Sequence, residues 1–160
     1  MEGPFPPPIW PALRGACPEV TLGLARPCKA CDAAAMYVAI AIAVGGAVGS
    51  LARHFLSGAV QGAAGGNFPW GILAVNIIGG FAMGLVVEAA ALRYSLAPEM
   101  RAFLTTGILG GFTTFSTFSL DTALMLERGD ILSAAAYVTA SVGLSVTALF
   151  LGLWLVRTIL

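Results

Sequence analysis

Charged residues are scarce in this chain. Of its 160 residues, 8 are Lys or Arg and 8 are Asp or Glu, so 10% carry a charge and the formal net charge is zero. A soluble domain carries about 25% charged residues, and a chain that is 58% apolar could not cover a surface in water. The low charge also excludes a disordered chain, and the lack of a basic excess excludes a nucleic-acid binder. The class that remains is an integral membrane protein.

Motifs for catalysis are also missing. The chain has a single histidine, His54, and neither a phosphate-binding glycine loop nor a zinc motif, so we expect no enzyme. All three cysteines lie within residues 1–35. Cys28 and Cys31 form a Cys-x-x-Cys pair that fits half a zinc site or a redox pair, but a structural zinc needs four ligands.

Residues 1–35 differ in composition from the rest of the chain. All but two of the nine prolines lie there, and the segment has neither the apolar stretch nor the basic start of a signal peptide. We expect a disordered, dispensable extension, whether or not it is native. An alternative is that translation begins at Met36, which leaves about the length that four spans with short loops require.

Uncharged stretches long enough to cross a membrane follow this extension. They lie between Asp32 and Arg53, Arg53 and Glu88, Arg101 and Asp121, and Asp130 and Arg157. A spanning helix needs roughly 20 apolar residues. The second stretch also holds a polar, glycine-rich patch over residues 57–69, which indicates a loop and the start of the next helix. The sequence therefore predicts an all-α membrane domain over residues 36–160, with helices near 36–56, 69–92, 99–127 and 131–158.

Basic residues are nearly balanced between the two sides of the membrane. Beyond the extension, one side carries Arg93, Arg101 and Arg157, and the other carries Arg53 and Arg128. The positive-inside rule gives such a chain almost no preferred orientation, so it can insert both ways up.

Small-residue motifs, which favour close helix contacts, are frequent. They are Gly45-x3-Gly49, Gly80-x3-Gly84 and Gly107-x3-Gly111. Two chains that meet in opposite orientations would form an inverted repeat. Transport proteins with inverted repeats place their sites at the midplane, on broken helices.

A glycine pair and a cluster of hydroxyl groups mark the third apolar stretch. Gly110 and Gly111 fall near its middle, and five Ser or Thr residues follow within 113–119. Such a sequence can open the helical hydrogen-bond ladder, and the freed carbonyls then need a partner, for which a small cation is one candidate. The alternative is an ordinary helix whose hydroxyls bond to their own backbone, but the density of hydroxyls and phenyl rings favours the break.

Three segments resemble the CrcB/Fluc fluoride channel family. The run GGFTTFSTFS at 110–119 is similar to the family signature, as are VNIIG at 75–79 and the pattern Gly45-Gly46-x2-Gly49-x3-Arg53. The similarity covers residues 36–160. One position departs mildly, because the family usually has Glu where this chain has Asp121.

The resemblance implies an antiparallel, dual-topology homodimer of four-helix chains in the cell (inner or plasma) membrane. Each chain would have a broken third helix, and the dimer would hold two fluoride pathways. It further implies a sodium ion on the two-fold axis, bound by the backbone carbonyls of Gly110 and Thr113 from each chain. The implied function is a fluoride-selective channel that exports F⁻ passively and protects the cell from fluoride toxicity. Its partners would be fluoride, the lipid bilayer and a second copy of the chain, without nucleic acid.

The resemblance also implies roles for individual residues. Phe115 and Phe118 correspond to the paired phenylalanines of the pathway, and Asn76 corresponds to its asparagine. Arg53 and Asp121 correspond to vestibule positions. The polar residues assigned to the pathway are Thr114, Ser119, Tyr137, Ser141 and Ser145.

These side chains suit a small, strongly hydrated anion. Amide N–H and hydroxyl O–H groups can replace water, and the positive edge of a phenyl ring can face an anion. Tyr137, Ser141 and Ser145 are spaced i, i+4, i+8 and form one stripe on a helix. Each assignment also has a simpler interpretation: phenylalanines that only pack, polar groups that join helices, and charges that reach towards the membrane surface.

The main alternative function is a small, dual-topology, proton-coupled multidrug exporter. That mechanism needs a protonatable carboxylate deep in a helix. The predicted first helix has none, and Glu88 and Asp121 lie towards helix ends. A purely structural membrane protein is a second alternative, but it would need neither Asn76 nor the hydroxyl stripe.

Overall fold

The computed structural model describes residues 29–92 and 96–159. The chain divides into two compact units, Met1–Met36 and Tyr37–Leu160. The first helix begins at Lys29, so residues 29–35 of the expected extension are helical. The expected disorder of the remaining extension, and the Cys28–Cys31 pair, lie outside what the structure describes.

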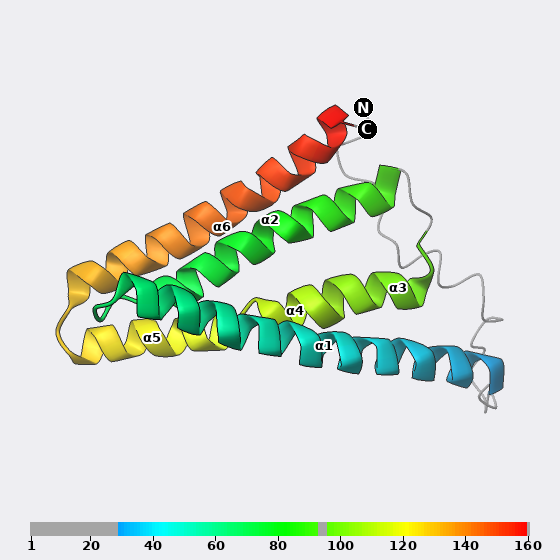
Figure 1. Ribbon diagram of the computed structural model, residues 1–160, viewed down its shortest axis with the longest axis horizontal. Coiled ribbons are helices and arrows are strands. Elements are labelled where there is room, and N and C mark those ends of the chain that lie inside the picture. Colours follow the sequence, from blue (N-terminus) through cyan, green and yellow to red (C-terminus); the bar gives the residue numbers. More distant parts are fainter. Residues whose placement is uncertain (1–28, 93–95, 160) are drawn as a thin grey trace, which may run out of the picture. The chain divides into compact units, whose positions relative to one another are not determined.

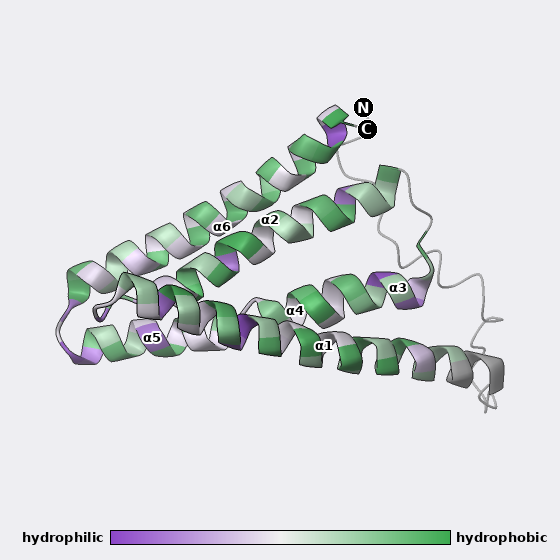
Figure 2. Ribbon diagram, in the orientation of Figure 1, coloured by the Kyte–Doolittle hydropathy of each residue, from purple (hydrophilic) through white to green (hydrophobic). Residues whose placement is uncertain are grey.

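Within the described residues every regular element is a helix (Figure 1). The helices are α1 (Lys29–Ala64), α2 (Trp70–Leu92), α3 (Pro98–Ala102), η2 (Phe103–Leu109), α4 (Gly110–Phe112), α5 (Phe115–Glu127) and α6 (Ile131–Ile159). Three stretches in them are long and apolar enough to cross a membrane: Ala34–Ala64, Trp70–Leu92 and Ile131–Ile159. Figure 2 shows apolar residues along most of α2 and α6.

Helix α1 is longer than the stretch 36–56 predicted from the charge pattern. It continues to Ala64, so the polar patch expected as a loop over 57–69 is helical in its first half. Arg53 ends the uncharged stretch but does not end the helix, because a single arginine is a good helix former. The helix stops only at Gly65 and Gly66, whose φ angles of 67° and 72° suit glycine.

The third predicted helix, near 99–127, which we expect to be broken, is divided into α3, η2, α4 and α5. Its residues 103–109 form a π-helix, and Thr113 and Thr114 are extended, with φ/ψ of −76°/156° and −149°/124°. The interruption therefore falls directly after Gly110 and Gly111, the pair expected to open the ladder of helical hydrogen bonds. Gly110 itself is helical, with φ −66° and ψ −36°.

Glycines let α1 pack closely against η2 and α4. A Cβ added to Gly45 would lie 2.7 Å from the Phe103 carbonyl oxygen, and one on Gly49 would collide with the carbonyl oxygen of Ile108. A Cβ on Gly111 would lie 2.7 Å from the Gly46 carbonyl oxygen. This contact uses the small residues that the sequence motifs predicted at close helix contacts.

Helices α2 and α6 pack side by side and run in the same direction (Figure 1). Gly80 meets the backbone of Ser145, and Gly84 meets the backbone at Leu149 and Gly152. Because the contacting residue numbers rise together along both helices, the pair is parallel. The first halves of α2 and α6 and both ends of α5 share a hydrophobic cluster, which contains Leu73, Phe118, Met125, Ala134 and Tyr137.

Candidate functional site

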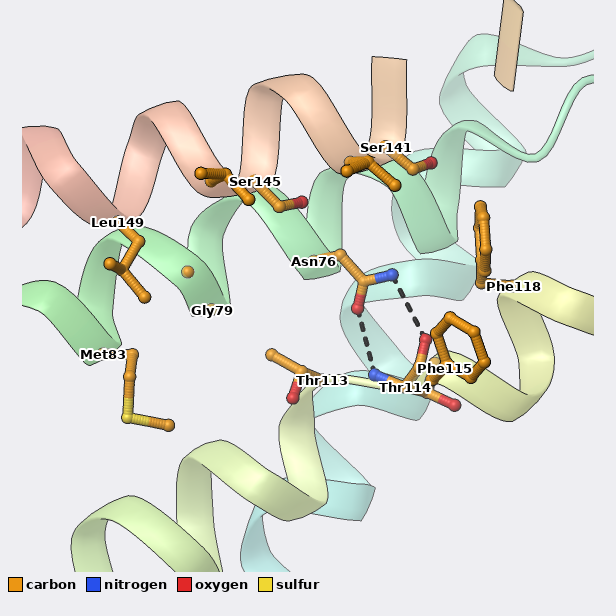
Figure 3. Close-up of a pocket in the computed structure, with 13 residues that line it drawn as sticks. Asn76, Gly79, Met83, Thr113, Thr114, Phe115, Phe118, Ser141, Ser145 and Leu149 are labelled. Carbon is orange, nitrogen blue, oxygen red and sulfur yellow. Dashed lines mark hydrogen bonds between the residues drawn. The ribbon is translucent and has the colours of Figure 1, made fainter. Parts of the chain in front are cut away.

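A cavity of about 420 Å³ lies beside the interruption between α4 and α5 (Figure 3). Its wall comes from α2, from the chain around the interruption and from the middle of α6. The sequence-predicted residues that line it are Asn76, Thr113, Thr114, Phe115, Phe118, Ser141 and Ser145. The fold thus brings together residues from three distant segments of the chain.

Asn76 joins α2 to the interruption through two hydrogen bonds. Its Nδ2 donates to the Thr114 carbonyl oxygen over 3.2 Å, and its Oδ1 accepts from the Thr114 backbone N–H over 3.0 Å (Figure 3). The side-chain amide therefore replaces a helical partner of the backbone. Since an amide nitrogen carries two N–H groups, one donor of Asn76 is left over from this pairing.

Gly110 and Thr113 are among the residues whose backbone carbonyls lose their helical donors at the interruption. In an uninterrupted helix the Thr114 N–H would donate to Gly110 and the Thr117 N–H to Thr113. Here the Thr114 N–H donates to Asn76, and the Thr117 N–H donates to Thr114 Oγ1 over 3.3 Å. These are the two carbonyls that the resemblance assigned to a cation.

Phe115 and Phe118 lie on the same wall but differ in exposure. Their ring centroids are 5.5 Å apart, with planes tilted by 42°. Phe115 is 79% exposed, whereas Phe118 is 9% exposed and also lies 5.3 Å from the ring of Tyr137. One ring is therefore held by the protein interior, and the other stands open at the cavity.

Ser141 and Ser145 present buried hydroxyl groups. Within residues 29–92 and 96–159, neither hydroxyl has a hydrogen-bond partner. Leaving a buried donor unsatisfied costs about 1–3 kcal/mol. Both serines also line the cavity, although their hydroxyl oxygens are themselves buried.

Five other predicted residues lie away from the cavity lining: Arg53, Gly110, Ser119, Asp121 and Tyr137. Tyr137 is fully buried behind Phe118, and its hydroxyl donates to Asp121 Oδ2 over 3.4 Å. The hydroxyl of Ser119 donates to the Phe115 carbonyl over 2.9 Å on an exposed face of α5. Arg53 is half-buried on α1. Tyr137 thus contacts the site through Phe118, while Ser141 and Ser145 reach the cavity directly.

The far end of the cavity is apolar, and the sequence did not predict its lining. It is lined by Gly79, Gly80 and Met83 of α2 and by Leu149 of α6. The three α2 residues share a helix face with Asn76, because they follow it at spacings of three, four and seven: Gly79, Gly80 and Met83. This spacing is the sequence signal that could have predicted them.

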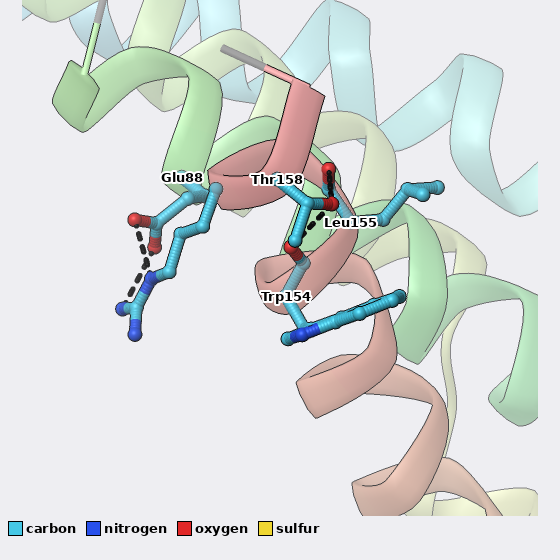
Figure 4. Close-up of polar contacts among 5 residues, drawn as sticks. Glu88, Trp154, Leu155 and Thr158 are labelled. Carbon is cyan, nitrogen blue, oxygen red and sulfur yellow. Dashed lines mark hydrogen bonds and ion pairs between the residues drawn. The ribbon is translucent and has the colours of Figure 1, made fainter.

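Glu88 of α2 and Arg157 of α6 form an ion pair at the other ends of the two helices. Figure 4 shows the Glu88 carboxylate with this contact as dashed lines. Arg157 Nε donates to Glu88 Oε1 over 2.8 Å, and its Nη2 donates to Oε2 over 3.1 Å. The Glu88 side chain is 9% exposed and the Arg157 side chain 54%. This carboxylate is thus neutralised by a bidentate partner and lies outside the cavity lining.

Comparison with known proteins identifies the family. The family described as CrcB-like protein, Camphor Resistance (CrcB), matches residues 40–153. The fluoride-specific ion channel FluC of Chelativorans sp. (strain BNC1) is 54% identical over 125 residues, which cover 78% of this chain and 100% of the relative. The protein of that name from Rhodospirillum centenum is 50% identical over 77% of this chain and 98% of the relative. That of Geobacter sulfurreducens is 50% identical over 76% and 98%. The family expected from the sequence is confirmed: this chain is a multi-pass membrane protein that belongs to the CrcB family.

Proposed function

We propose that this protein is a fluoride-selective ion channel that lets F⁻ leave the cell passively, down its electrochemical gradient, and so limits fluoride toxicity. The observation that carries the proposal is a cavity whose lining combines Ser141 and Ser145 with the rings of Phe115 and Phe118, and the buried hydroxyls of both serines have no partner among the described residues. The relatives, each named a fluoride-specific ion channel, support the same function.

The donors around the cavity suit conduction rather than tight binding. Ser141, Ser145 and the remaining Asn76 N–H are neutral, and the lining residues include no charged side chain. An ion must bind well enough to shed water and weakly enough to leave. A membrane potential that is negative inside drives the anion out by about 2.3 kcal/mol per 100 mV.

The proposed channel is an antiparallel homodimer. We assign α3, η2, α4 and α5 to one interrupted third span, so that each chain crosses the membrane four times. The open Phe115 ring beside the cavity supports a second copy that completes the pathway. The balanced basic residues support insertion in both orientations.

A sodium ion fits the interruption. The carbonyls of Gly110 and Thr113 have lost their helical donors to side chains, and carbonyl oxygen is a preferred ligand of hard cations. In the proposed dimer these carbonyls from both copies would hold the ion on the two-fold axis. The ion would supply a fixed positive charge near the pathways.

The direct test is fluoride release from liposomes that contain the purified full-length chain, followed with a fluoride electrode. Fast fluoride release without chloride release is expected. Phe118→Ile should abolish the release while the dimer still assembles, because it removes the ring edge from the cavity. Phe55→Ile is the matched control, because Phe55 is 70% exposed on α1. Absence of fluoride release from a well-folded dimer would contradict the proposed function.

The proton-coupled exporter is less well supported, because both carboxylates near helix ends have partners. Glu88 pairs with Arg157, and Asp121 accepts from Tyr137. We expect Glu88→Gln to leave the rate of fluoride release within about twofold of the unmodified chain, since the substitution is nearly isosteric and lies away from the cavity. An exporter that uses Glu88 as its proton carrier would lose proton-coupled drug uptake in the same vesicles.

A further inference from the structure

The loop between α1 and α2 is fastened by one side chain. Gln61 Nε2 donates to the carbonyl oxygens of Gly66 and Phe68, over 3.2 and 3.0 Å. Its Oε1 accepts from the backbone N–H of Gly71 over 3.2 Å. One amide thus satisfies three backbone groups and ties the end of α1, the loop and the start of α2 together.

The fastened loop directs the Phe68 ring into the aromatic residues behind the cavity. The ring centroid of Phe68 lies 5.6 Å from that of Tyr137, at an interplanar angle of 84°. This edge-to-face geometry is one that aromatic pairs favour. Phe68 also lies 4.5 Å from the ring of Trp70, which begins α2. The loop therefore packs on Tyr137 through an oriented ring.

Tyr137 packs between Phe68 of the loop and Phe118 of the cavity wall. It is fully buried, with Phe68 on one side and the ring of Phe118 at 5.3 Å on another. Phe118 in turn lines the cavity, next to Phe115. A continuous set of ring contacts therefore runs from the loop to the proposed pathway, although Phe68 and Gln61 do not line the cavity themselves.

We propose that Gln61 and Phe68 are positioning residues of the pathway: the loop that Gln61 fastens holds Phe68 against Tyr137, and Tyr137 holds the Phe118 ring at the cavity. The inference rests on the proposed fluoride channel. It assigns a role in ion passage to a loop that contributes no side chain to the cavity.

The test uses the full-length chain in liposomes at a density where most active vesicles hold one channel. A folding defect lowers the fraction of vesicles that release fluoride. A positioning defect lowers the rate of release in those vesicles that do release it. The two quantities therefore separate a positioning role from a purely structural one.

Phe68→Leu is expected to slow fluoride release by about tenfold, because a small displacement of a positioned group is costly. Phe68→Tyr, which keeps the ring, should restore most of the rate. The matched control Phe55→Leu removes an exposed ring from α1 and should leave the rate unchanged.

Gln61→Glu keeps the size of the side chain but removes both N–H donors to the loop carbonyls. It should slow release as Phe68→Leu does, and the double variant should be no slower than either single variant, because both act through one contact. An unchanged rate in Phe68→Leu, or a lowered active fraction with a normal rate, would overturn the positioning role alone. Absence of release from the unmodified chain would overturn the proposed channel and this inference together.

Discussion

At the scale of single residues, the informative feature is a set of polar groups whose partners are missing or exchanged. The Ser141 and Ser145 hydroxyls are buried without partners among the described residues, and the Asn76 amide has replaced a helical partner of Thr114. Such groups cost stability, so their presence in a cavity wall indicates a ligand that satisfies them. In the proposed channel, this loss of folding free energy is a trade that keeps these donors for an anion.

This trade predicts opposite effects of one substitution on stability and on flux. Ser145→Ala removes an unpartnered hydroxyl, so it should leave the thermal stability unchanged or raise the free energy of unfolding by up to about 1 kcal/mol. The same change should slow fluoride release by about tenfold, because a donor is lost. Thermal unfolding in detergent and electrode traces from liposomes measure the two effects.

Thr147→Ala is the matched control for Ser145→Ala. Its hydroxyl lies on an exposed face of α6 and donates to the Gly143 carbonyl over 2.7 Å. The control should change neither the release rate nor the stability by much. A Ser145→Ala chain that conducts normally would show that this hydroxyl faces the cavity without serving the ion.

The sequence could predict which residues line the site better than how they interact. Asn76, Phe115 and Phe118 belong to motifs, and Ser141 and Ser145 follow from a helical stripe. The bond between Asn76 and the Thr114 backbone joins residues 38 apart in sequence, so no local pattern contains it. Tyr137 shares the serine stripe by spacing, but its bulk places it under Phe118 rather than in the cavity.

At the scale of helices, continuous apolar runs were predictable and the interruption was only partly so. The predicted ranges 69–92 and 131–158 agree closely with α2 and α6. The interruption sits at Thr113 and Thr114 rather than at the glycine pair, because Asn76 of a different helix competes for the Thr114 backbone. The glycines instead serve close packing, as Gly111 does against α1.

Gly49 tests the packing of α1 on the interrupted segment. A Cβ there collides with the Ile108 carbonyl and lies 2.9 Å from the Phe112 nitrogen, so Gly49→Ala should destabilise the fold by about 1–3 kcal/mol. A Cβ on the neighbouring Gly46 meets nothing within 4 Å. Gly46→Ala should therefore be neutral or stabilise by about 0.5–1 kcal/mol, because alanine favours the helix.

Thermal unfolding of the two glycine variants in the same detergent gives the comparison. Gly49→Ala should unfold at a lower temperature than the unmodified chain, and Gly46→Ala should not. Equal loss of stability in both variants would instead indicate that a second surface, rather than the Ile108 backbone, limits the space along this face of α1.

At the scale of the whole molecule, the helix ends on each side of the membrane determine where added charge can set the orientation of a chain. The end of α1 and the start of α2 meet at Gln61 and Gly71, and α5 passes to α6 on that same side of the proposed four-span chain. The end of α6 and the start of α3 lie on the opposite side. Since few basic residues mark either side, a small change in charge should decide the orientation.

Pairs of added lysines therefore provide a test of dual topology. Ala97→Lys with Ile159→Lys adds charge to one side, and Ala64→Lys with Glu127→Lys adds it to the other; all four positions are exposed. Each double variant expressed alone should insert mainly one way up and release little fluoride. Because lysine is drawn to the cytoplasmic side, the two variants should insert in opposite orientations.

Coexpression of the two lysine variants separates an orientation effect from damage to the channel. If the active unit is an antiparallel dimer, each variant supplies the copy that the other lacks, and fluoride resistance of the host cells should return. If each variant alone confers full resistance, the active unit does not need both orientations. If cells stay sensitive to fluoride with either variant alone and with both together, the added charges impair the chain itself. Moving the lysines one turn further along the same helix ends would test this explanation. If fluoride resistance returns only in cells that express both variants, an oppositely oriented copy is needed for the channel. That copy would then complete the cavity beside the exposed Phe115 ring.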